Sequence, residues 1–428
     1  MNNNNILNVR MHGKPMGILG QDGNGKMYFH YLKPFPESQV SISQSLPLSM
    51  NERIFSEKEC RPFFEGLLPD SEAARDTIAK RHGISARNSF RLLQAIGQDC
   101  PGAVSFHEID EPIREVEFET LDVDFKTDEE IESYIKKLST SNPLFHGIDD
   151  IRLSLAGVQN KAGIYVDPLN PVSEKIGIPR NGMPSTHILK PEIATFPNSA
   201  FNEYFCLTLA QASHLNAANV SFRKIGNTPC VIVQRYDRDF GTRYIKRLHQ
   251  EDFCQALGKL PTQKYQNEGG PSLEDCFKLL NLIDRINFTK YIIFNFVVGN
   301  TDAHGKNFSI LYGDHTPPKL APLYDVLCCQ IYEGHSQKMA MKIGGEYEAK
   351  NVFAKHWKEF CESVGLSFPE FKKEAQKMGK LISIAMDRVI QISKKYNSLS
   401  DEETAFSGKL RGVIQGNIDT LLERLKDK

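Results

Sequence analysis

The spacing of apolar residues changes after the first 50 positions of the chain. Three segments of alternating apolar and polar residues come first, at positions 6–11, 15–19 and 26–31, and a turn-forming run, DGNG, separates the last two. Alternation interrupted by such a turn predicts a small antiparallel sheet. Beyond position 56 the apolar residues recur three and four apart, which predicts a helix.

Two more helices are predicted before position 104. Asp70 is placed to cap one of them, and Ser85 is placed to open the other. We therefore expect residues 1–110 to form a subdomain of one small sheet and several helices. The stretch 108–130 is rich in acidic residues, so we expect a linker or an exposed surface strand there.

The rest of the chain divides into a mostly β part, 111–238, and a mainly helical part, 239–428. In the first part a helix is predicted at about 199–214, among short apolar runs at 162–166, 187–190, 220–224 and 231–235. In the second part helices are predicted at 250–257, 273–284, 288–298, 351–364 and two long C-terminal segments, with β-like pieces at 307–312 and 319–323. The pattern predicts an α+β fold in which a mostly β lobe precedes a helical lobe.

Composition narrows the class of protein. With 428 residues, 40% apolar and 25% charged, the chain is typical of a globular protein of two or three domains, and no apolar run is long enough to span a membrane. We therefore expect a cytoplasmic protein.

A net charge of −1 lacks the basic excess that binds nucleic acid, so any action on DNA would need a partner. Nine cysteines without a C-x-x-C pair argue against a disulfide scaffold or a structural zinc site, and we interpret adjacent Cys328 and Cys329 as small apolar residues.

A β lobe carrying one helix, followed by a helical lobe, is the layout of protein kinases, in which ATP binds between the lobes. The spacing in GNTDAHGKNF supports this reading, since Asp302 and Asn307 are placed as in the kinase catalytic loop. There the carboxylate accepts the proton of the substrate hydroxyl and the carboxamide reaches the metal. Asp325, after the next apolar run, is a candidate second ligand, because magnesium prefers hard oxygen donors.

Two upstream segments fit the same layout. Lys190 ends a β-like run, THILK, where kinases carry the lysine that holds the α- and β-phosphates, and Glu203 in the next helix is its candidate ion-pair partner. The usual glycine-rich loop is absent. In its place RLSLAGVQNK contains a single glycine, and the backbone amides of residues 156–161, with Lys161 as a point charge, are a candidate phosphate cradle.

Each of these residues also has an ordinary interpretation. Asp302 and Asp325 are most often caps when they occur alone, and Lys190 and Glu203 are most often solvated surface residues. His304, close to Asp302, raises the alternative of a metal hydrolase, but no second histidine stands at ligand spacing. The order and lobe placement of the residues together favour the kinase interpretation.

The motifs along the chain also match a known family. In the first subdomain they are SLPL, FFEGLLPDS and IGQDCPGAV, and further along they are RLSLAGVQNK, THILK, NEYFCL, VQRYDR, HQEDFCQ, GNTDAHGKNF and PLYD. With these segments the chain resembles, almost end to end, the HipA family of serine/threonine kinase toxins from bacterial HipBA toxin–antitoxin modules. The resemblance implies a protein-kinase-like two-lobed fold with an extra N-terminal subdomain, and ATP and Mg²⁺ as cofactors.

The resemblance implies a role for each matching residue. Asp302 falls on the catalytic base, Asn307 and Asp325 on the magnesium ligands, Lys190 on the ATP lysine, and Ser154 on the serine that family members autophosphorylate to switch the kinase off. The implied nucleotide contacts are the phosphate loop (Ala156, Gly157, Val158, Gln159, Asn160, Lys161), the hinge strand (Gln234, Arg235, Tyr236), and His304, Gly305, Lys306, Asn307 and Tyr324. Asn160 departs from the acidic residue of the family loop, and Gln234 from the frequent hinge glutamate.

The family likeness further implies a function and partners. It points to an aminoacyl-tRNA synthetase, glutamyl-tRNA synthetase being the best-known case, as the protein substrate whose phosphorylation stalls translation. It also implies a HipB-like helix-turn-helix antitoxin through which the chain reaches operator DNA. Two alternatives stay open, namely a co-repressor with secondary or no kinase activity and a small-molecule kinase, although the first subdomain argues against the latter.

Overall fold

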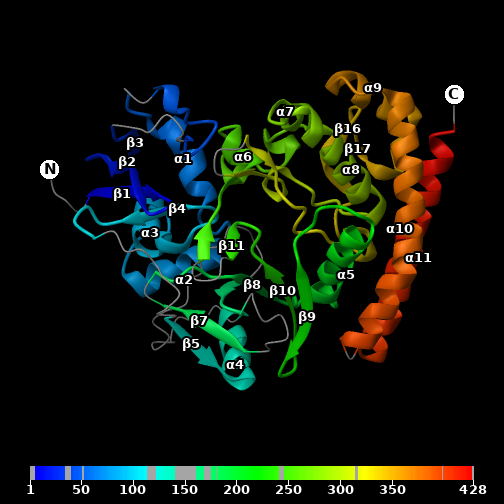
Figure 1. The fold of residues 1–428 in the computed structure, drawn as a ribbon, viewed down its shortest axis with the longest axis horizontal. Helices are drawn as coiled ribbons and strands as arrows, with labels where there is room; N and C mark the ends of the chain where they lie inside the picture. The colour runs from blue at the N-terminus through cyan, green and yellow to red at the C-terminus, as the bar shows by residue number, and fades with distance from the viewer. Residues whose placement is uncertain are drawn as a thin grey trace.

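The computed structural model describes residues 5–33, 40–50, 53–112, 122–139, 161–167, 175–180, 182–240, 245–313, 317–397 and 399–426. Helices occur together with antiparallel sheets in these residues, which confirms the predicted α+β class. Figure 1 shows the N-terminal strands and helices in blue and cyan on one side, and two long C-terminal helices, in orange and red, along the opposite side. No helix within the described ranges is long and apolar enough to cross a membrane.

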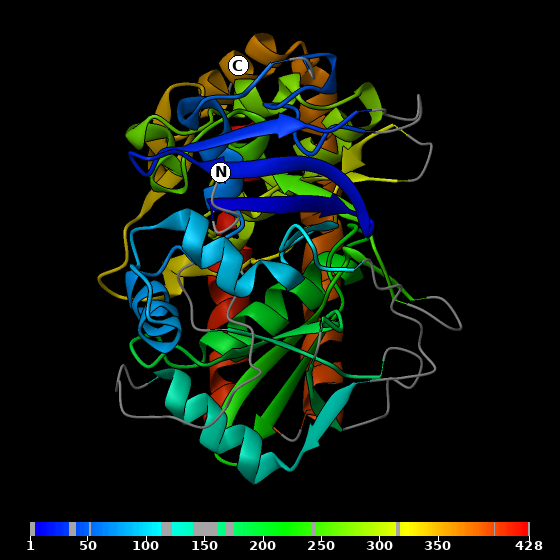
Figure 2. The same cartoon turned by 90° about the vertical axis from the view of Figure 1, so that its left-hand side faces the viewer.

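The N-terminal module, residues 5–107, is built on a four-stranded antiparallel sheet, which spans the front of Figure 2. Its strand order is β3-β2-β1-β4, formed by β1 (Ile6–Met11), β2 (Lys14–Gln21), β3 (Met27–Tyr31) and β4 (Val104–His107). The predicted three-stranded meander is therefore confirmed. The fourth strand was not predicted, because it joins β1 only after the chain has passed through three helices: α1 (Glu57–Gly66), α2 (Glu72–His82) and α3 (Ser89–Ile96).

Two predicted helix caps of this module were wrong. Ser71, not Asp70, caps α2, since its side chain accepts a hydrogen bond from the Ala74 amide. Asn88, not Ser85, caps α3. Both helices have an alternative polar residue nearby that the local pattern does not distinguish. The carboxylate of Asp70 is directed to a different partner, described below.

The second region is a four-stranded sheet, β6-β8-β10-β9, with a helix packed on each face. Its strands are β6 (Ala162–Ile164), β8 (His187–Pro191), β9 (Val220–Ile225) and β10 (Thr228–Gln234), all near predicted positions. Cys230 and Ile232 of β10 belong to the core that holds α4 (Asp128–Ser139), whereas Val231 and Val233 pack with α5 (Ser199–Ala212). This alternation follows from the two-residue period of a strand.

The acid-rich stretch 108–130 was predicted only in part. Val123–Lys126 forms the surface strand β5, paired with β7 (Ile176–Pro179), as expected. The following acidic residues, however, open helix α4. Thr127 and Glu130 exchange hydrogen bonds as a capping box, and acidic side chains interact favourably with the positive end of the helix dipole.

The third region is mainly helical, with a three-stranded sheet at its boundary. The sheet is β13 (His249–Asp252), β14 (Ser309–Tyr312) and β15 (Lys319–Leu320), and the two-stranded ribbons are β11 (Arg238–Phe240) with β12 (Ile245–Arg247) and β16 (Lys338–Ile343) with β17 (Glu346–Glu348). The helices are α6 (Phe253–Ala256), α7 (Leu273–Lys278), α8 (Leu282–Val298), α9 (Ala354–Val364), α10 (Phe368–Tyr396) and α11 (Asp401–Arg424). The long pair α10 and α11 packs against α5 and α8, and shares one large core with them.

Two helices predicted in this region differ from the structure. The prediction at 250–257 was wrong in its first half, where β13 forms a strand because it pairs with β14. The predicted helix 273–284 is broken: Asn281 caps a new helix, α8, by accepting a hydrogen bond from the Asp284 amide. All nine cysteines lie in the described part of the chain, where they are buried and form no disulfide.

Candidate active site

A cavity of about 700 Å³ lies where the β lobe, the helical region and the N-terminal module meet. Its wall brings together most of the residues singled out from the sequence. They are Lys161, Lys190, Glu203, Gln234, Arg235, Tyr236, Asp302, His304, Lys306, Asn307, Tyr324 and Asp325. Gly305 belongs to the same loop, but its close neighbours are Cys254 and Pro271. Ser154 and the phosphate-loop residues Ala156, Gly157, Val158, Gln159 and Asn160 lie outside the described residues.

Lys190 is held between two carboxylates. Its ammonium nitrogen lies 2.6 Å from Oε1 of Glu203 and 2.6 Å from Oδ1 of Asp325. Burial by itself favours the neutral amine, but the two carboxylates outweigh it and raise the pKa of Lys190. Burial likewise opposes ionisation of Asp325, yet Lys190 and Lys161 lower the pKa of this carboxyl. Lys190 and Asp325 are therefore held in their charged forms near pH 7, whereas burial raises the pKa of Glu203.

The fold explains why these three residues meet. Lys190 faces α5 because it pairs with Val231 of β10, whose side chain packs on the same helix. Glu203 lies on the first part of α5. The neighbouring Asn202 exchanges two hydrogen bonds with the backbone of Cys328, which ties α5 to the segment that carries Asp325. These hydrogen bonds, together with the hydrophobic core that α5 and the segment share, fix the spacing between them.

Asp325 has a left-handed backbone conformation, with φ of +58°. Aspartate is among the few residues that adopt this conformation at small cost, and such residues concentrate at functional sites. Just before it, Leu323 forms a parallel bridge with Ala217 beyond the end of α5. The turn and the bridge direct the carboxylate of Asp325 back toward Lys190.

Asp302 lies on a loop that is braced by its own amides. Its backbone nitrogen donates to Oδ1 of Asn300 at 3.1 Å, and its carbonyl accepts from Nδ2 of Asn307 at 2.9 Å. The carboxylate accepts a 2.6 Å hydrogen bond from the hydroxyl of Tyr265, and its side chain is 42% exposed, so it faces the cavity. The five-residue spacing read from the sequence therefore closes a compact loop, in which the Asn307 side chain bonds the backbone carbonyl of Asp302.

His304 lies on the same loop, two residues after Asp302. It is buried, and burial lowers the pKa of its imidazole to about 4, so it is neutral near pH 7. Its ring packs edge-on against Tyr265, and Nε2 lies 4.0 Å from Asp302, too far for a hydrogen bond. Nδ1 is buried and has no hydrogen-bond partner. No cluster of three histidine, cysteine or acidic residues suited to a metal occurs among the described residues.

The donors around the cavity suit a nucleotide triphosphate with magnesium. Asp325 and Asn307 offer the hard carboxylate and amide oxygens that magnesium prefers, and the nucleotide phosphates and water would complete its shell. Lys161, Lys190, Lys264 and Lys306 provide positive charge on the same wall. Burial, together with nearby Lys190, lowers the pKa of Lys161 to about 8.

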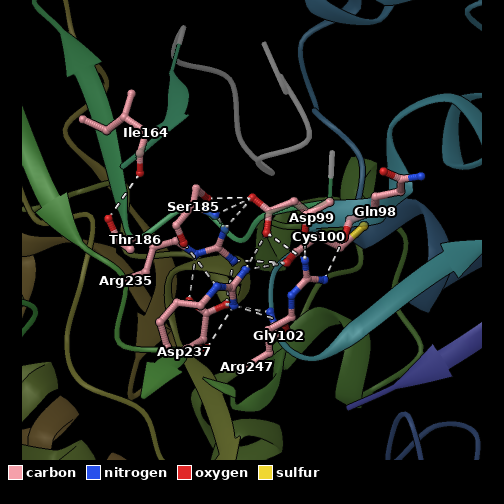
Figure 3. A network of polar contacts seen from close by, with 12 residues as sticks. Gln98, Asp99, Cys100, Gly102, Ile164, Ser185, Thr186, Arg235, Asp237 and Arg247 are labelled. Atoms are coloured by element: carbon pink, nitrogen blue, oxygen red, sulfur yellow. Dashed lines mark hydrogen bonds and ion pairs between the residues drawn. The ribbon is translucent and has the colours of Figure 1, made fainter. Parts of the chain in front are cut away.

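The segment 234–236 forms one edge of the cavity and joins the two lobes. The ring of Tyr236 lies 5.5 Å from that of Tyr324, whose hydroxyl donates to the carbonyl of Lys306 at 2.7 Å. The guanidinium of Arg235 is used elsewhere: it bonds both oxygens of Asp237 and the hydroxyl of Ser185. Its side chain thus belongs to a buried network shown in Figure 3.

That network joins the N-terminal module to the lobes, along a contact surface that we call the seam. Asp99 accepts hydrogen bonds from Arg238 at 2.9 Å and from the hydroxyl of Ser185 at 2.7 Å, and Asp237 accepts from the Gly102 amide at 2.7 Å (Figure 3). Elsewhere along the seam Glu251 accepts from Ser43 and from the Gln44 amide, and Gln255 donates to the carbonyl of Phe63.

Sequence reasoning missed two residues that contact the catalytic loop. Tyr265 contacts Asp302, and Asp70 contacts Lys306. The spacing around Tyr265 carries no signal for its role, because the contact depends on how the loop before α7 folds back. Asp70 was noticed, but only as a helix cap.

Comparisons with known proteins agree with this architecture. A sequence profile described as the HipA-like C-terminal domain matches residues 153–390, and one described as the HipA N-terminal domain matches residues 7–107. The first covers more than half of the chain. The chain belongs to the HipA family of kinases.

Relatives of this HipA-family chain extend over most of its length. Y4mE of Sinorhizobium fredii is 39% identical over 394 residues, covering 90% of this chain and 92% of its own. The serine/threonine-protein kinase toxin HipA of Shewanella oneidensis is 28% identical over 383 residues, covering 84% of each.

A solved structure confirms the predicted fold. HipA from the Shewanella oneidensis complex of HipA, HipB and operator DNA superposes with a TM-score of 0.84 at 25% identity, covering 98% of each chain. The kinase-like fold expected from the lobe layout is therefore correct.

Proposed function

We propose that this HipA-family chain transfers the γ-phosphoryl group of ATP, with magnesium, to a serine or threonine hydroxyl of a protein. The observation that carries the proposal is the pairing of Lys190 with both Glu203 and Asp325, at 2.6 Å each, on the wall of the cavity that also receives Asp302. Phosphoryl transfer needs mainly positioning and charge neutralisation, and this arrangement supplies both.

Each residue then has a defined task. Asp302 accepts the proton of the attacking hydroxyl, and Lys190 holds the nucleotide phosphates in place. Asn307 and Asp325 would hold magnesium, which neutralises charge on the phosphates when it is bound. Residues 234–236 would receive the adenine through backbone groups, and Lys161 would close the phosphate end. The domain boundaries at residues 110 and 238 remain predictions.

We propose that this activity makes the chain a growth-arresting toxin. The Shewanella oneidensis relative is named a kinase toxin, and the family resemblance points to an aminoacyl-tRNA synthetase, such as glutamyl-tRNA synthetase, as the protein substrate. Ser154 is the proposed autophosphorylation site that ends activity. We further propose a HipB-like antitoxin that brings the chain to operator DNA, since the similar structure is of such a complex and the net charge here is only −1.

The experiment compares wild type and Asp302→Ala by intact-mass and peptide mass spectrometry after incubation with ATP and magnesium. We expect one phosphate on Ser154 in wild type and none in the variant, because only wild type keeps the base that accepts the hydroxyl proton. Arrest of growth on expression should be lost in the same variant. Repression of an operon by the variant with its antitoxin should persist.

Two outcomes would contradict the proposal. If wild type neither binds nucleotide nor acquires phosphate, the kinase proposal fails and the alternative of an antitoxin-bound co-repressor is favoured. If Asp302→Ala still arrests growth, phosphoryl transfer is not the toxic activity.

A further inference from the structure

The N-terminal module extends one carboxylate into the cavity. Asp70 lies in the short connection, residues 67–71, between α1 and α2. Because Ser71 caps α2, the Asp70 side chain is not used as a cap. It lines the same cavity as Asp302 and Asp325. The helix α1 that precedes it is fixed against Gln255: the Gln255 side-chain amide donates to the carbonyl of Phe63, and a Cβ at Gly66 would meet the Gln255 side chain at 2.6 Å.

The partner of Asp70 is a residue of the catalytic loop. Nζ of Lys306 lies 2.5 Å from Oδ1 of Asp70, and the two side chains are 5% and 10% exposed. Lys306 stands between His304 and Asn307 in the turn Gly305–Asn307. The two residues are 236 positions apart, so the ion pair forms only when the N-terminal module is docked.

Lys306 is linked to both proposed magnesium ligands, so its ion pair with Asp70 also affects where they lie. Its carbonyl accepts a 2.7 Å hydrogen bond from the hydroxyl of Tyr324, the residue before Asp325. Asn307 follows it directly and bonds the carbonyl of Asp302. A displacement of the Lys306 side chain would therefore be felt at the proposed base and at both ligands.

The lysines around Asp70 favour its ionised form. Burial opposes ionisation, but Lys306, Lys264 and Lys161 together lower the pKa of this carboxyl. Asp70 is the one carboxylate that forms an ion pair with Lys306 among the described residues. Without it Lys306 would be an unpaired buried ammonium, and it would be drawn toward any phosphate in the cavity.

We propose that Asp70 is a positioning residue for phosphoryl transfer, acting through Lys306, so that the N-terminal module completes the catalytic loop. The proposal rests on the kinase function proposed above. Asp70 fixes the position of the Lys306 side chain in the cavity wall and thereby keeps Asp302, Asn307 and Asp325 in their relative positions. The proposal predicts that removal of the Asp70 carboxylate slows phosphoryl transfer more than it weakens nucleotide binding.

The test uses the full chain with Asp70→Asn, Lys306→Met and the double variant. Asp76→Asn is the matched control, since Asp76 is an exposed acid on the neighbouring helix α2. We would measure the rate of phosphate incorporation from ATP per folded molecule, the dissociation constant of a non-hydrolysable ATP analogue with magnesium, and the melting temperature.

We expect Asp70→Asn to lower the rate about tenfold or more, with the dissociation constant changed less than about threefold. In the Lys306→Met background the same substitution should have little further effect, because its partner is already gone. If Asp70→Asn does not fold, the double variant decides. It should then fold and match Lys306→Met in rate, since no unpaired ammonium is left.

Three results would overturn the inference. The first is a rate for Asp70→Asn equal to that for Asp76→Asn, and the second is a lower melting temperature of Asp70→Asn with an unchanged rate per folded molecule. Equal losses from Asp70→Asn with and without Lys306 would show that the two residues act independently. An inactive wild type would instead refute the kinase function itself, which is a distinguishable result.

Discussion

Two clusters of buried charge lie close together in this protein and differ in what surrounds them. In the cleft, Lys190 contacts Glu203 and Asp325, and the Asp325 side chain is 34% exposed toward the cavity. In the seam, Arg235 and Arg238 contact Asp99 and Asp237, and no side chain among these four exceeds 6% exposure. Basic side chains contact carboxylates in both clusters, at 2.6 Å in the cleft and at 2.7–3.6 Å in the seam.

The difference shows that a buried ion pair does not indicate a catalytic site by itself. The seam charges satisfy one another: Arg235 and Arg238 overcome the effect of burial and lower the pKa of Asp237 to about 2. The cleft charges meet an open cavity in which phosphates and a metal can replace part of the pairing. We therefore expect the seam to determine stability and the cleft to determine activity.

The largest expected effect is on stability in the seam. Asp99→Asn places an amide, with its own N–H donors, against Arg238 and Ser185, so that buried donors face each other. Breaking such a buried pair costs about 3–5 kcal/mol in the free energy of unfolding. Chemical denaturation should show the loss, with Asp110→Asn, an exposed acid, as control. A loss below about 1 kcal/mol would mean that the network is not structural.

The cleft should show the opposite behaviour. Lys190→Met removes the cation that holds the phosphates, and we expect the rate of phosphate incorporation to fall about 10²–10³-fold. The free energy of unfolding should change less than in Asp99→Asn, because burial already raises the pKa of Glu203, which can take up a proton. Lys355→Met, on an exposed face of α9, is the control. Unchanged phosphate incorporation would refute the assignment of Lys190.

The smallest expected effect is a pH dependence in the seam. Burial raises the pKa of Glu251 from 4.5 to about 7, although Ser43, the Gln44 amide and Tyr312 donate to it. The folded state thus favours the protonated acid. Its contribution to stability is fully present below pH 4.5 and is lost as the pH rises through about 7.

The corresponding measurement is the free energy of unfolding at pH 5 and pH 8. Relative to Glu251→Gln, wild type should lose no more than about 3 kcal/mol between these values. Glu359→Gln, an exposed acid on α9, should keep the wild-type pH dependence. A wild-type profile that stays parallel to that of Glu251→Gln would show that Glu251 does not titrate in this range.

Much of the candidate site was predictable because its signals are local. Asp302 and Asn307 lie on one loop whose spacing sets their geometry, and Lys190 ends a strand with a clear apolar pattern. Tyr265 was not predictable in this way. Its hydroxyl meets Asp302 across 37 positions, by a fold of the loop before α7 that no periodicity encodes.

The same division applies to the fold. Alternation and helical spacing predicted the strands and helices that bury one face, since burial imposes a period on the sequence. The period does not tell which strand joins which sheet, so β4 was missed and β13 was taken for a helix. Helix caps were misplaced because Asp70 and Ser71 are both chemically suitable.

The sequence by itself determined the order of the lobes, the family and several of the residues that line the cleft, among them Lys190, Asp302 and Asp325. Tertiary structure alone decided that Asp70 pairs with Lys306, and that Asp99 reaches Arg238 across 139 positions. The physical reason is that a charge can pair with any opposite charge that folding brings near it. Only the docking of the N-terminal module on the lobes selects these partners, and with them the position of the catalytic loop.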